Sequence, residues 1–123
     1  MSKQALVVDD SLTMRNMVSV AMKKEGFNVI LAKDGVEAIK AAEGHNWDVI
    51  ITDINMPNMD GIELIRLLRE SATTKTTPIL VLTTEGGENV KQAGKAAGAS
   101  GWIVKPFNPE VLLNAVKKVC NVS

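Results

Sequence analysis

The segment DVIITDINMPNMDG at residues 48–61 decides the fold. It opens with an apolar run that ends in Asp53 and then passes into a loop that contains proline and glycine. A short apolar run followed by turn residues is typical of a strand buried on both faces of a parallel sheet. Similar runs precede Asp9, Thr83 and Lys105. The strands expected from these patterns span residues 5–9, 28–32, 48–53, 79–83 and 101–105.

The segments between these strands repeat apolar residues with the helical period. Ile62, Ile65 and Leu68 share one face of a helix, and the same spacing places Met17 and Val36 on buried faces. The methionines expected to fill gaps in the core are Met14, Met17 and Met22. Strands that alternate with helices are the pattern of β-α units around a parallel sheet. The sequence therefore predicts the α/β class, with a doubly wound, five-stranded parallel sheet.

Residues that start and end helices support these boundaries. Asp34 with Glu37 three positions later is a capping-box pattern, and Asn108 followed by proline supplies an N-cap and the first helical residue. Glycines at 26, 44 and 98 stand where helices end in a left-handed residue. The glycine pair at 86–87 leaves the start of the fourth helix poorly specified, so we expect that segment to be the most mobile.

Length and composition narrow the function classes. A chain of 123 residues suffices for one core, so we expect a single domain over residues 1–123 that acts as a monomer. Fourteen basic and fourteen acidic side chains cancel, which removes the basic footprint of a nucleic-acid binder and any overall attraction to anionic membranes. The single cysteine, Cys120, fits a reducing compartment, and the sequence shows neither a spanning stretch of roughly twenty apolar residues nor a signal peptide. We expect a cytoplasmic protein that binds neither nucleic acid nor membrane.

Three carboxylates follow the apolar runs and predict a cation site. The carboxyl ends of parallel strands meet at one edge of the sheet, so Asp9, Asp10 and Asp53 should lie together there. Such carboxylates repel one another unless they hold a cation, and oxygen ligands favour magnesium. The alternative for Asp9 and Asp10 alone is a helix cap with a solvated neighbour. A zinc site is disfavoured, because the only histidine, His45, has no cysteine nearby.

Two further strand ends supply groups that suit phosphoryl chemistry. Lys105 needs a counter-charge at the end of an apolar strand, and Asp53 is the natural one. The Thr83 hydroxyl adds a neutral donor. A metal ion, an ammonium group and a hydroxyl together can neutralise the oxygens of a phosphoryl group carried on a carboxylate. Neither a phosphate-binding glycine loop nor a dinucleotide fingerprint is present in the sequence.

Four motifs in this order resemble the receiver domain of two-component response regulators, and most closely the stand-alone CheY-type chemotaxis proteins. The motifs are ValValAspAspSer at 7–11, ThrAspIleAsnMetProAsnMetAspGly at 52–61, LeuThrThrGlu at 82–85 and LysProPhe at 105–107. The resemblance covers residues 5–119. It implies a flavodoxin-like sheet with the strand order 2-1-3-4-5.

The resemblance also implies roles for the residues at the strand ends. Asp53 would accept a phosphoryl group from a phosphohistidine of a sensor kinase of the CheA type. Magnesium would be bound by Asp10, by Asp53 and by the backbone carbonyl of Asn55, while Asp9 would act through a bound water. Thr83 and Lys105 would contact the phosphoryl oxygens. Lys105–Pro106 is the position of the family's cis peptide, and X–Pro bonds are the ones that adopt cis at tolerable cost.

The residues of the output side follow from the same resemblance. Thr83 would move toward the phosphoryl group while Trp102 turns inward, and the alternative for Trp102 is a plain packing role. Asn55 and Glu85 would flank the path of the hydrolytic water and tune its rate. Trp47 is expected to be a packing residue. Four lysines of the last two expected helices have two interpretations: they form a basic and aromatic docking face beside Trp102, or they belong to ordinary solvated helix faces. These lysines are Lys91, Lys95, Lys117 and Lys118.

The function expected from the sequence is that of a phosphorylation-activated response regulator in chemotaxis. Since no output domain is expected, the response would come from binding a flagellar switch protein of the FliM type or another downstream protein, and a phosphatase is a further possible partner. The alternative is a phosphate sink or phosphorelay shuttle. The chain would be no enzyme beyond its own phosphoryl transfer and autodephosphorylation. A magnesium-dependent phosphatase of small molecules is disfavoured, because the sequence has no cap insertion or substrate-sized loop.

Overall fold

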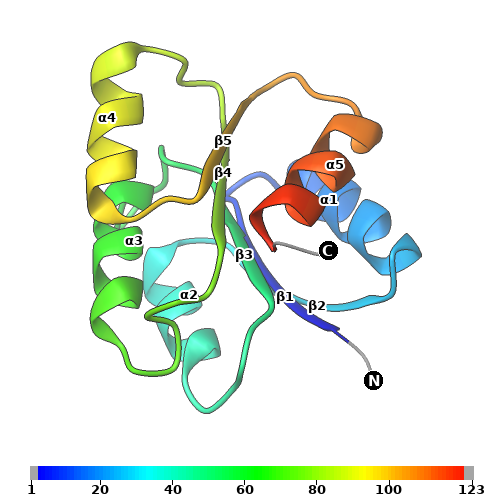
Figure 1. The fold of residues 1–123 in the computed structure, drawn as a ribbon, viewed down its shortest axis with the longest axis horizontal. Coiled ribbons are helices and arrows are strands. Elements are labelled where there is room, and N and C mark those ends of the chain that lie inside the picture. The colour runs from blue at the N-terminus through cyan, green and yellow to red at the C-terminus, as the bar shows by residue number, and fades with distance from the viewer. Residues whose placement is uncertain (1–2, 121–123) are drawn as a thin grey trace.

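Strands and helices alternate through the computed structural model, which describes residues 3–120 (Figure 1). The strands are β1 (Lys3–Val8), β2 (Phe27–Ala32), β3 (Val49–Thr52), β4 (Ile79–Thr83) and β5 (Gly101–Val104). The helices are α1 (Leu12–Lys24), α2 (Gly35–Ala42), α3 (Gly61–Glu70), α4 (Glu88–Ala97) and α5 (Pro109–Val119). The predicted α/β class is confirmed.

The strands form one parallel sheet in the order β2-β1-β3-β4-β5, which confirms the predicted topology. Val8 at the end of β1 pairs with Ala32 of β2 and with Thr52 of β3. Thr83 at the end of β4 pairs with Val104 of β5. Because these ends are in register, the residues that follow them leave the sheet at the same edge.

Two layers of helices cover the sheet. Helices α1 and α5 lie on one face, and α2, α3 and α4 lie on the other (Figure 1). Alternate strand residues supply the two cores: Ile51 packs with the α1 and α5 side chains, whereas its neighbour Ile50 packs with those of α2 and α3. Full burial of one such side chain is worth about 1.5–3 kcal/mol.

Burial differs between the central and the edge strands. Every residue of β3 and β4 is buried, as expected for strands covered on both faces. In β2, however, the exposed fraction is 43% for Ile30 and 38% for Leu31. These two side chains are exposed because β2 lies at the edge of the sheet and pairs only with β1.

Helix ends follow the predicted signals. The Asp34 side chain accepts a hydrogen bond from the Glu37 N–H at the start of α2, and the Asn108 side chain accepts one from the Val111 N–H at the start of α5. Gly26, Gly44 and Gly98 have φ of 90°, 76° and 120°. Helix α4 begins after Gly87, which supplies no side-chain cap. The start of α4 is therefore the least specified of the five described.

Two residues assigned to buried helix faces are exposed instead. The buried stripe of α1 contains Val18, Ala21 and Met22, so Met17 lies at its border with an exposed fraction of 45%. Val36 of α2 has an exposed fraction of 43%, because Ala38 and Ala42 face the core. The core role predicted for Met17 was wrong.

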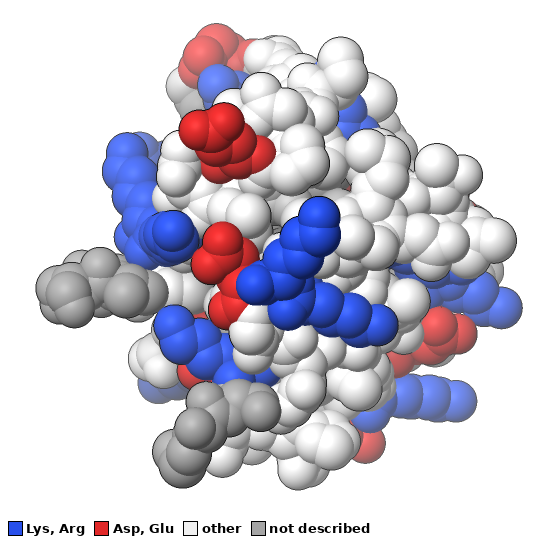
Figure 2. Space-filling view, turned by 90° about the vertical axis from the view of Figure 1, so that its right-hand side faces the viewer, with Lys and Arg blue, Asp and Glu red and all other residues white. Residues whose placement is uncertain are grey.

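Met17 instead lines an open hollow of about 360 Å³ with Val20 and Phe107. The side of the molecule that carries α1 and α5 shows basic and acidic side chains interspersed among uncharged ones (Figure 2). Among residues 3–120, no helix has the length and apolar character needed to cross a bilayer.

Candidate functional site

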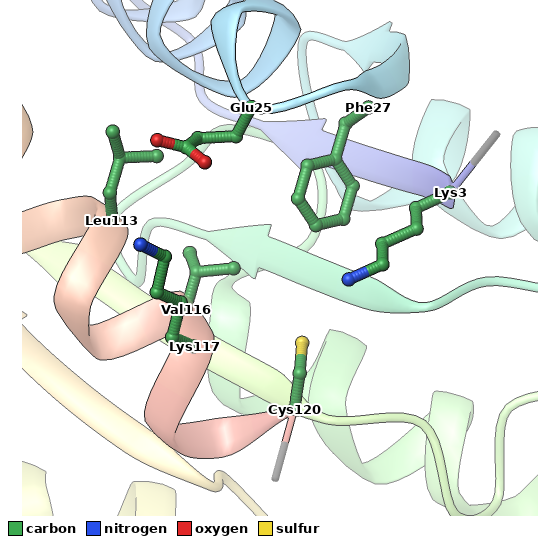
Figure 3. Close-up of a pocket in the computed structure, with 7 residues that line it drawn as sticks. All are labelled: Lys3, Glu25, Phe27, Leu113, Val116, Lys117 and Cys120. Atoms are coloured by element: carbon green, nitrogen blue, oxygen red, sulfur yellow. The ribbon is translucent and has the colours of Figure 1, made fainter. Parts of the chain in front are cut away.

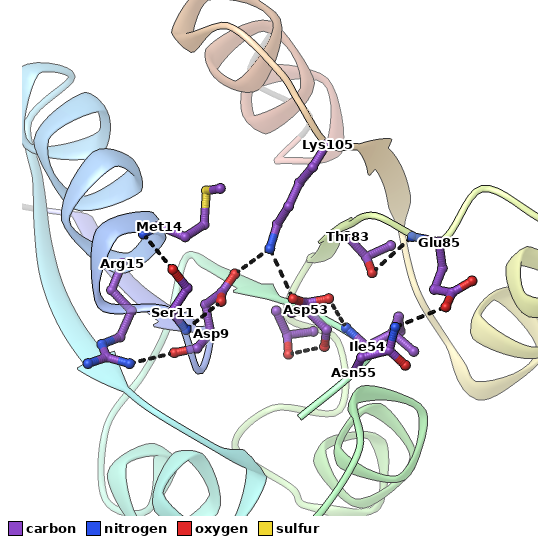
Figure 4. A network of polar contacts seen from close by, with 11 residues as sticks. Asp9, Ser11, Met14, Arg15, Asp53, Ile54, Asn55, Thr83, Glu85 and Lys105 are labelled. Carbon is purple, nitrogen blue, oxygen red and sulfur yellow. Dashed lines mark hydrogen bonds and ion pairs between the residues drawn. The ribbon is translucent and has the colours of Figure 1, made fainter. Parts of the chain in front are cut away.

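The carboxyl edge of the sheet brings together Asp9, Asp53 and Lys105, which follow β1, β3 and β5 (Figure 4). The Lys105 ammonium donates to Asp9 Oδ2 at 2.8 Å and to Asp53 Oδ2 at 2.9 Å. The sequence indicated Asp53 as the counter-charge of Lys105. The structure adds Asp9, so one cation bridges carboxylates from two strand ends.

Burial and charge act in opposite directions on Lys105. Removal from water would lower the pKa of its ammonium group, but hydrogen bonds and charge attraction from Asp9 and Asp53 outweigh this effect. The net result is a pKa raised above its usual value of 10.5. Lys105 therefore stays charged at neutral pH.

Asp9, Asp10 and Asp53 offer carboxylate oxygens that all lie within 4.8 Å of one another. Asp9 and Asp53 are buried, and Asp10 is exposed. Both Asp9 oxygens already accept hydrogen bonds, Oδ1 from the Ser11 N–H at 2.9 Å and Oδ2 from Lys105. Lys105 compensates one of the three charges, and a hard divalent cation fits the oxygen donors that remain.

Asp53 is fixed by its own loop. Its Oδ1 atom accepts a hydrogen bond of 2.6 Å from the Ile54 N–H, and its backbone carbonyl accepts one of 2.8 Å from the Thr52 hydroxyl. Helix α3 begins against this segment: the Gly61 N–H donates to the Ile54 carbonyl at 2.8 Å, and a Cβ at Gly61 would overlap the Asp53 carbonyl oxygen. The sequence motif contained Gly61, but its close approach to Asp53 was not foreseen.

Residues on the β4 side of the site form a connected chain of contacts (Figure 4). The Thr83 side chain is fully buried, and its oxygen accepts a hydrogen bond of 3.3 Å from the Glu85 N–H. The Glu85 carboxylate accepts a hydrogen bond of 3.0 Å from the Asn55 amide, and the Glu85 carbonyl accepts one of 2.9 Å from the Trp102 indole. Three parts of Glu85 thus contact Thr83, Asn55 and Trp102. The Lys105–Pro106 peptide bond that follows β5 is cis.

Three residues of this edge were missed by the sequence reasoning. Arg15 of α1 donates to the Asp9 carbonyl at 2.7 Å and fixes the turn before α1. Asn58 has a positive φ of 70°, and its amide donates to Asp34 Oδ2 at 2.8 Å. The third is Gly61. Only the residue types of a turn signalled Asn58, since asparagine tolerates the left-handed conformation.

Two aromatic residues have different surroundings. Trp47 is buried, donates to the Ala42 carbonyl at 3.2 Å and packs in the core beside α2 and α3, which confirms its packing role. Trp102 is half-buried on the α4 side of β5, and its neighbour Ile103 faces the opposite core. Lys91 and Lys95 line a hollow of about 170 Å³ beside Trp102.

Lys117 does not belong to that surface. It lines a separate pocket of about 100 Å³ with Phe27 and Cys120, between the end of α5 and the start of the strands (Figure 3). Burial raises the pKa of the Cys120 thiol. Of the two interpretations of these lysines, a docking face beside Trp102 therefore does not include Lys117, which lies beside Phe27 at the start of β2.

The family model of the response regulator receiver domain matches residues 5–117. The chain therefore belongs to the response regulator receiver domain family. This family comprises phosphorylation-activated regulators of two-component systems, which interact with histidine kinases and downstream targets and bind Mg²⁺ at an acidic pocket. It is not a catalytic enzyme family as such.

Individual relatives agree with this family. The chain is 40% identical over 116 residues to the chemotaxis protein CheY1 of Helicobacter pylori (strain ATCC 700392 / 26695), covering 93% of this chain and 94% of the relative. It is 48% identical to the chemotaxis response regulator CheY4 of Vibrio cholerae, with a TM-score of 0.92 and coverage of 97% of this chain and 99% of the other.

A more distant structure has the same fold. The receiver domain of sensor histidine kinase PA1611 from Pseudomonas aeruginosa PAO1, with magnesium coordinated in its active site cleft, is 24% identical with a TM-score of 0.90. The alignment covers 98% of this chain and 99% of that one.

Proposed function

We propose that Asp53 is the phosphorylation site of a receiver that works in chemotaxis. The observation that carries this proposal is the position of the Asp53 carboxylate, which lies within 4.8 Å of two other carboxylates and 2.9 Å from the Lys105 ammonium. A carboxylate so placed has an ammonium group beside it, and the two neighbouring carboxylates add oxygen ligands of the kind that a hard divalent cation prefers. The similarity to chemotaxis proteins from two organisms supports the pathway.

The proposed phosphodonor is a phosphohistidine of a sensor kinase of the CheA type. An Asp53 carboxylate oxygen attacks phosphorus, the P–N bond breaks, and the histidine nitrogen keeps the electron pair of that bond. The Lys105 ammonium then donates to a phosphoryl oxygen in place of one of its present carboxylate partners. The Thr83 hydroxyl accepts from the Glu85 N–H, so its own proton remains available for a second phosphoryl oxygen.

Magnesium is the proposed cofactor, held by Asp10, Asp53 and the backbone carbonyl of Asn55. Asp9 is assigned a role through a bound water, and its two carboxylate oxygens accept hydrogen bonds from the Ser11 N–H and the Lys105 ammonium. When bound, magnesium would neutralise phosphoryl charge that the Lys105 ammonium alone leaves uncompensated.

The lifetime of the phosphorylated state is proposed to depend on Asn55 and Glu85. Their side chains are joined by a hydrogen bond of 3.0 Å and lie two residues beyond Asp53 and Thr83. A water that attacks phosphorus from the side opposite the Asp53 oxygen would pass these two side chains. Return of the Asp53 carboxylate and release of inorganic phosphate complete this autodephosphorylation.

The output is proposed to be binding of another protein by a single receiver over residues 1–123 in the cytoplasm. Trp102 and Thr83 are assigned to the switch, and a flagellar switch protein of the FliM type is the proposed partner. Capture of such a protein in the presence of beryllofluoride and magnesium, which mimic the acyl phosphate, tests this assignment. Equal capture with and without the mimic would contradict it.

Labelling with radioactive acetyl phosphate tests the acceptor. The wild type should incorporate phosphate, whereas Asp53→Asn should incorporate none. Asp60→Asn is the matched control, because Asp60 lies in the same loop and asparagine also caps α3. Undiminished labelling of the Asp53→Asn protein would refute the assignment of Asp53.

A further inference from the structure

Helix α4 carries a glycine where it meets the Trp102 indole. Gly94 is buried, and the other nine residues of α4 are not. Glycine is disfavoured in a helix interior because it loses more backbone freedom on folding than any other residue. Its presence in the middle of α4 therefore calls for a packing reason.

The packing reason is the absence of a side chain at this position. A Cβ at Gly94 would overlap Trp102 Cζ3 and would lie 3.3 Å from Cε3 and 3.4 Å from Cη2. All three atoms belong to the six-membered ring of the indole. That ring therefore occupies the space that any other residue at position 94 would fill.

The other edge of the indole is fixed by a hydrogen bond. Trp102 Nε1 donates to the Glu85 carbonyl at 2.9 Å, in the loop between β4 and α4. The ring is thus held at two points that belong to different segments, the bare backbone of α4 and the loop before it. A tryptophan that only filled space would need the first contact alone.

The end of α4 cannot easily move away to relieve an overlap. The Gly98 and Ala99 N–H groups both donate to the Gly94 carbonyl, at 3.1 Å and 3.0 Å. The Arg69 guanidinium donates to the Gly98 carbonyl through Nε and Nη2, at 3.1 Å and 2.8 Å. A side chain at position 94 would therefore displace the indole rather than the helix.

We infer that Gly94 is a positioning residue that seats the Trp102 indole against α4. Together with the Glu85 carbonyl it sets the orientation of the indole in the protein that carries no phosphoryl group. The surface beside Lys91 and Lys95 is then shaped by the packing of α4 on β5. In Gly94→Ala the indole turns outward and loses its hydrogen bond to Glu85.

Tryptophan fluorescence tests this inference in a Trp47→Phe background, where Trp102 is the only tryptophan. Gly94→Ala should shift the emission to longer wavelength and increase quenching by acrylamide. Gly87→Ala is the matched control, because Gly87 precedes the same helix and a Cβ there meets nothing within 4 Å. An emission spectrum and quenching equal to those of the parent in Gly94→Ala would overturn the inference. The measurement uses no phosphodonor, so its outcome is independent of the proposed function.

A double-mutant cycle separates seating of the indole from a general effect on α4. Phenylalanine at 102 lacks the outer ring atoms, so in Trp102→Phe the Gly94→Ala change should raise the melting temperature through better helix propensity. In the protein that keeps Trp102, Gly94→Ala should lower the melting temperature, or raise it less than in the Trp102→Phe background. Equal changes in melting temperature in both backgrounds would overturn the inference. This comparison also decides the matter if the single Gly94→Ala variant is less stable than its parent.

Discussion

Asp34 shows how single residues make stability depend on pH. The Glu37 N–H and then the Asn58 amide lower the pKa of this carboxyl group from its usual value of 3.8. A group whose pKa is lower in the folded protein stabilises the fold above its unfolded pKa, and this contribution is lost as pH falls through the folded pKa. The free energy of unfolding of the wild type should therefore drop below pH 3.8.

The comparison that isolates Asp34 uses Asp34→Asn, which still caps α2 but does not titrate. Urea unfolding at pH values on both sides of 3.8 should show a smaller drop for this variant than for the wild type. Asn58→Gly keeps the left-handed backbone and removes the amide, so its drop should lie between the two. Parallel pH curves for wild type and Asp34→Asn would contradict the role of Asp34.

Sequence reasoning at this scale succeeded where strand ends position a residue. Asp9, Asp53 and Lys105 could be placed at one edge because parallel strands fix where each of them leaves the sheet. The hydrogen bond from the Asn58 amide to Asp34 could not be foreseen, because it joins two loops and depends on the positive φ of Asn58. Contacts between loops leave no periodic pattern in the sequence.

At the scale of elements, two glycines that start helices differ in what they touch. A Cβ at Gly61 would overlap the Asp53 carbonyl oxygen, whereas one at Gly35 would meet only the Met59 side chain. A change of rotamer can move the Met59 Cγ and Sδ atoms, so that only the Met59 Cβ, at 2.8 Å, still has to give way, whereas the backbone of Asp53 is held by the Thr52 hydroxyl and by the sheet. Overpacking of this kind typically costs about 1–3 kcal/mol.

We therefore predict that Gly61→Ala lowers the free energy of unfolding by about 1–3 kcal/mol or more, and that Gly35→Ala lowers it by clearly less. Urea denaturation gives both values. Gly61→Ala should also slow labelling by acetyl phosphate, because the displaced carbonyl belongs to Asp53 itself. Equal costs for the two substitutions would show that the backbone of Asp53 adapts.

Arg69 connects three elements through backbone carbonyls. Its Nη1 donates to Thr74, Lys75 and Thr77 in the loop before β4, while Nε and Nη2 donate to Gly98 at the end of α4. Burial lowers the pKa of its guanidinium group. Hydrogen bonds of a charged group contribute about 1.5–3 kcal/mol.

Arg69→Ala should lower the free energy of unfolding by about 1.5–3 kcal/mol and speed amide exchange at Gly98 and Ala99. Arg69→Lys should recover only part of the lost stability, because one ammonium group cannot donate to the loop before β4 and to Gly98 at the same time. The control is Arg66→Ala, which removes an exposed ion pair with Glu63 and should cost about 0–1 kcal/mol. A loss no larger for Arg69→Ala than for Arg66→Ala would contradict the connecting role.

The element scale also shows the limit of periodicity. The pattern located every helix, but it misplaced Met17 and Val36, because a helix of two or three turns has apolar residues at the border of its buried stripe. How far neighbouring helices cover that border is a property of the packed layers. The sequence of one helix does not reveal how much of this border its neighbours cover.

At the scale of the whole molecule, metal binding and stability are linked. If magnesium binds the folded protein at Asp10 and Asp53, a magnesium concentration one hundred times Kd should raise the free energy of unfolding by about 2.7 kcal/mol. Without magnesium, Asp10→Asn should be more stable than the wild type, because one of three neighbouring carboxylates is neutral.

Thermal unfolding with and without magnesium measures both effects. The wild type should gain stability on addition of the metal, and Asp10→Asn should not. Glu70→Gln serves as a control for the loss of an exposed negative charge away from the acidic cluster. The same magnesium response in wild type and Asp10→Asn would exclude Asp10 as a ligand.

The hydrogen bond between Trp102 and the Glu85 carbonyl has a consequence for how this protein can diverge. The Glu85 side chain contacts Asn55, where we place control of the lifetime, but Trp102 is bound by the main chain, which every amino acid provides. A mutation at position 85 can thus alter how long a signal lasts without changing which surface is presented to a partner. If Asn55 and Glu85 control the lifetime as proposed, duration and recognition are separable traits, and selection can change one without loss of the other.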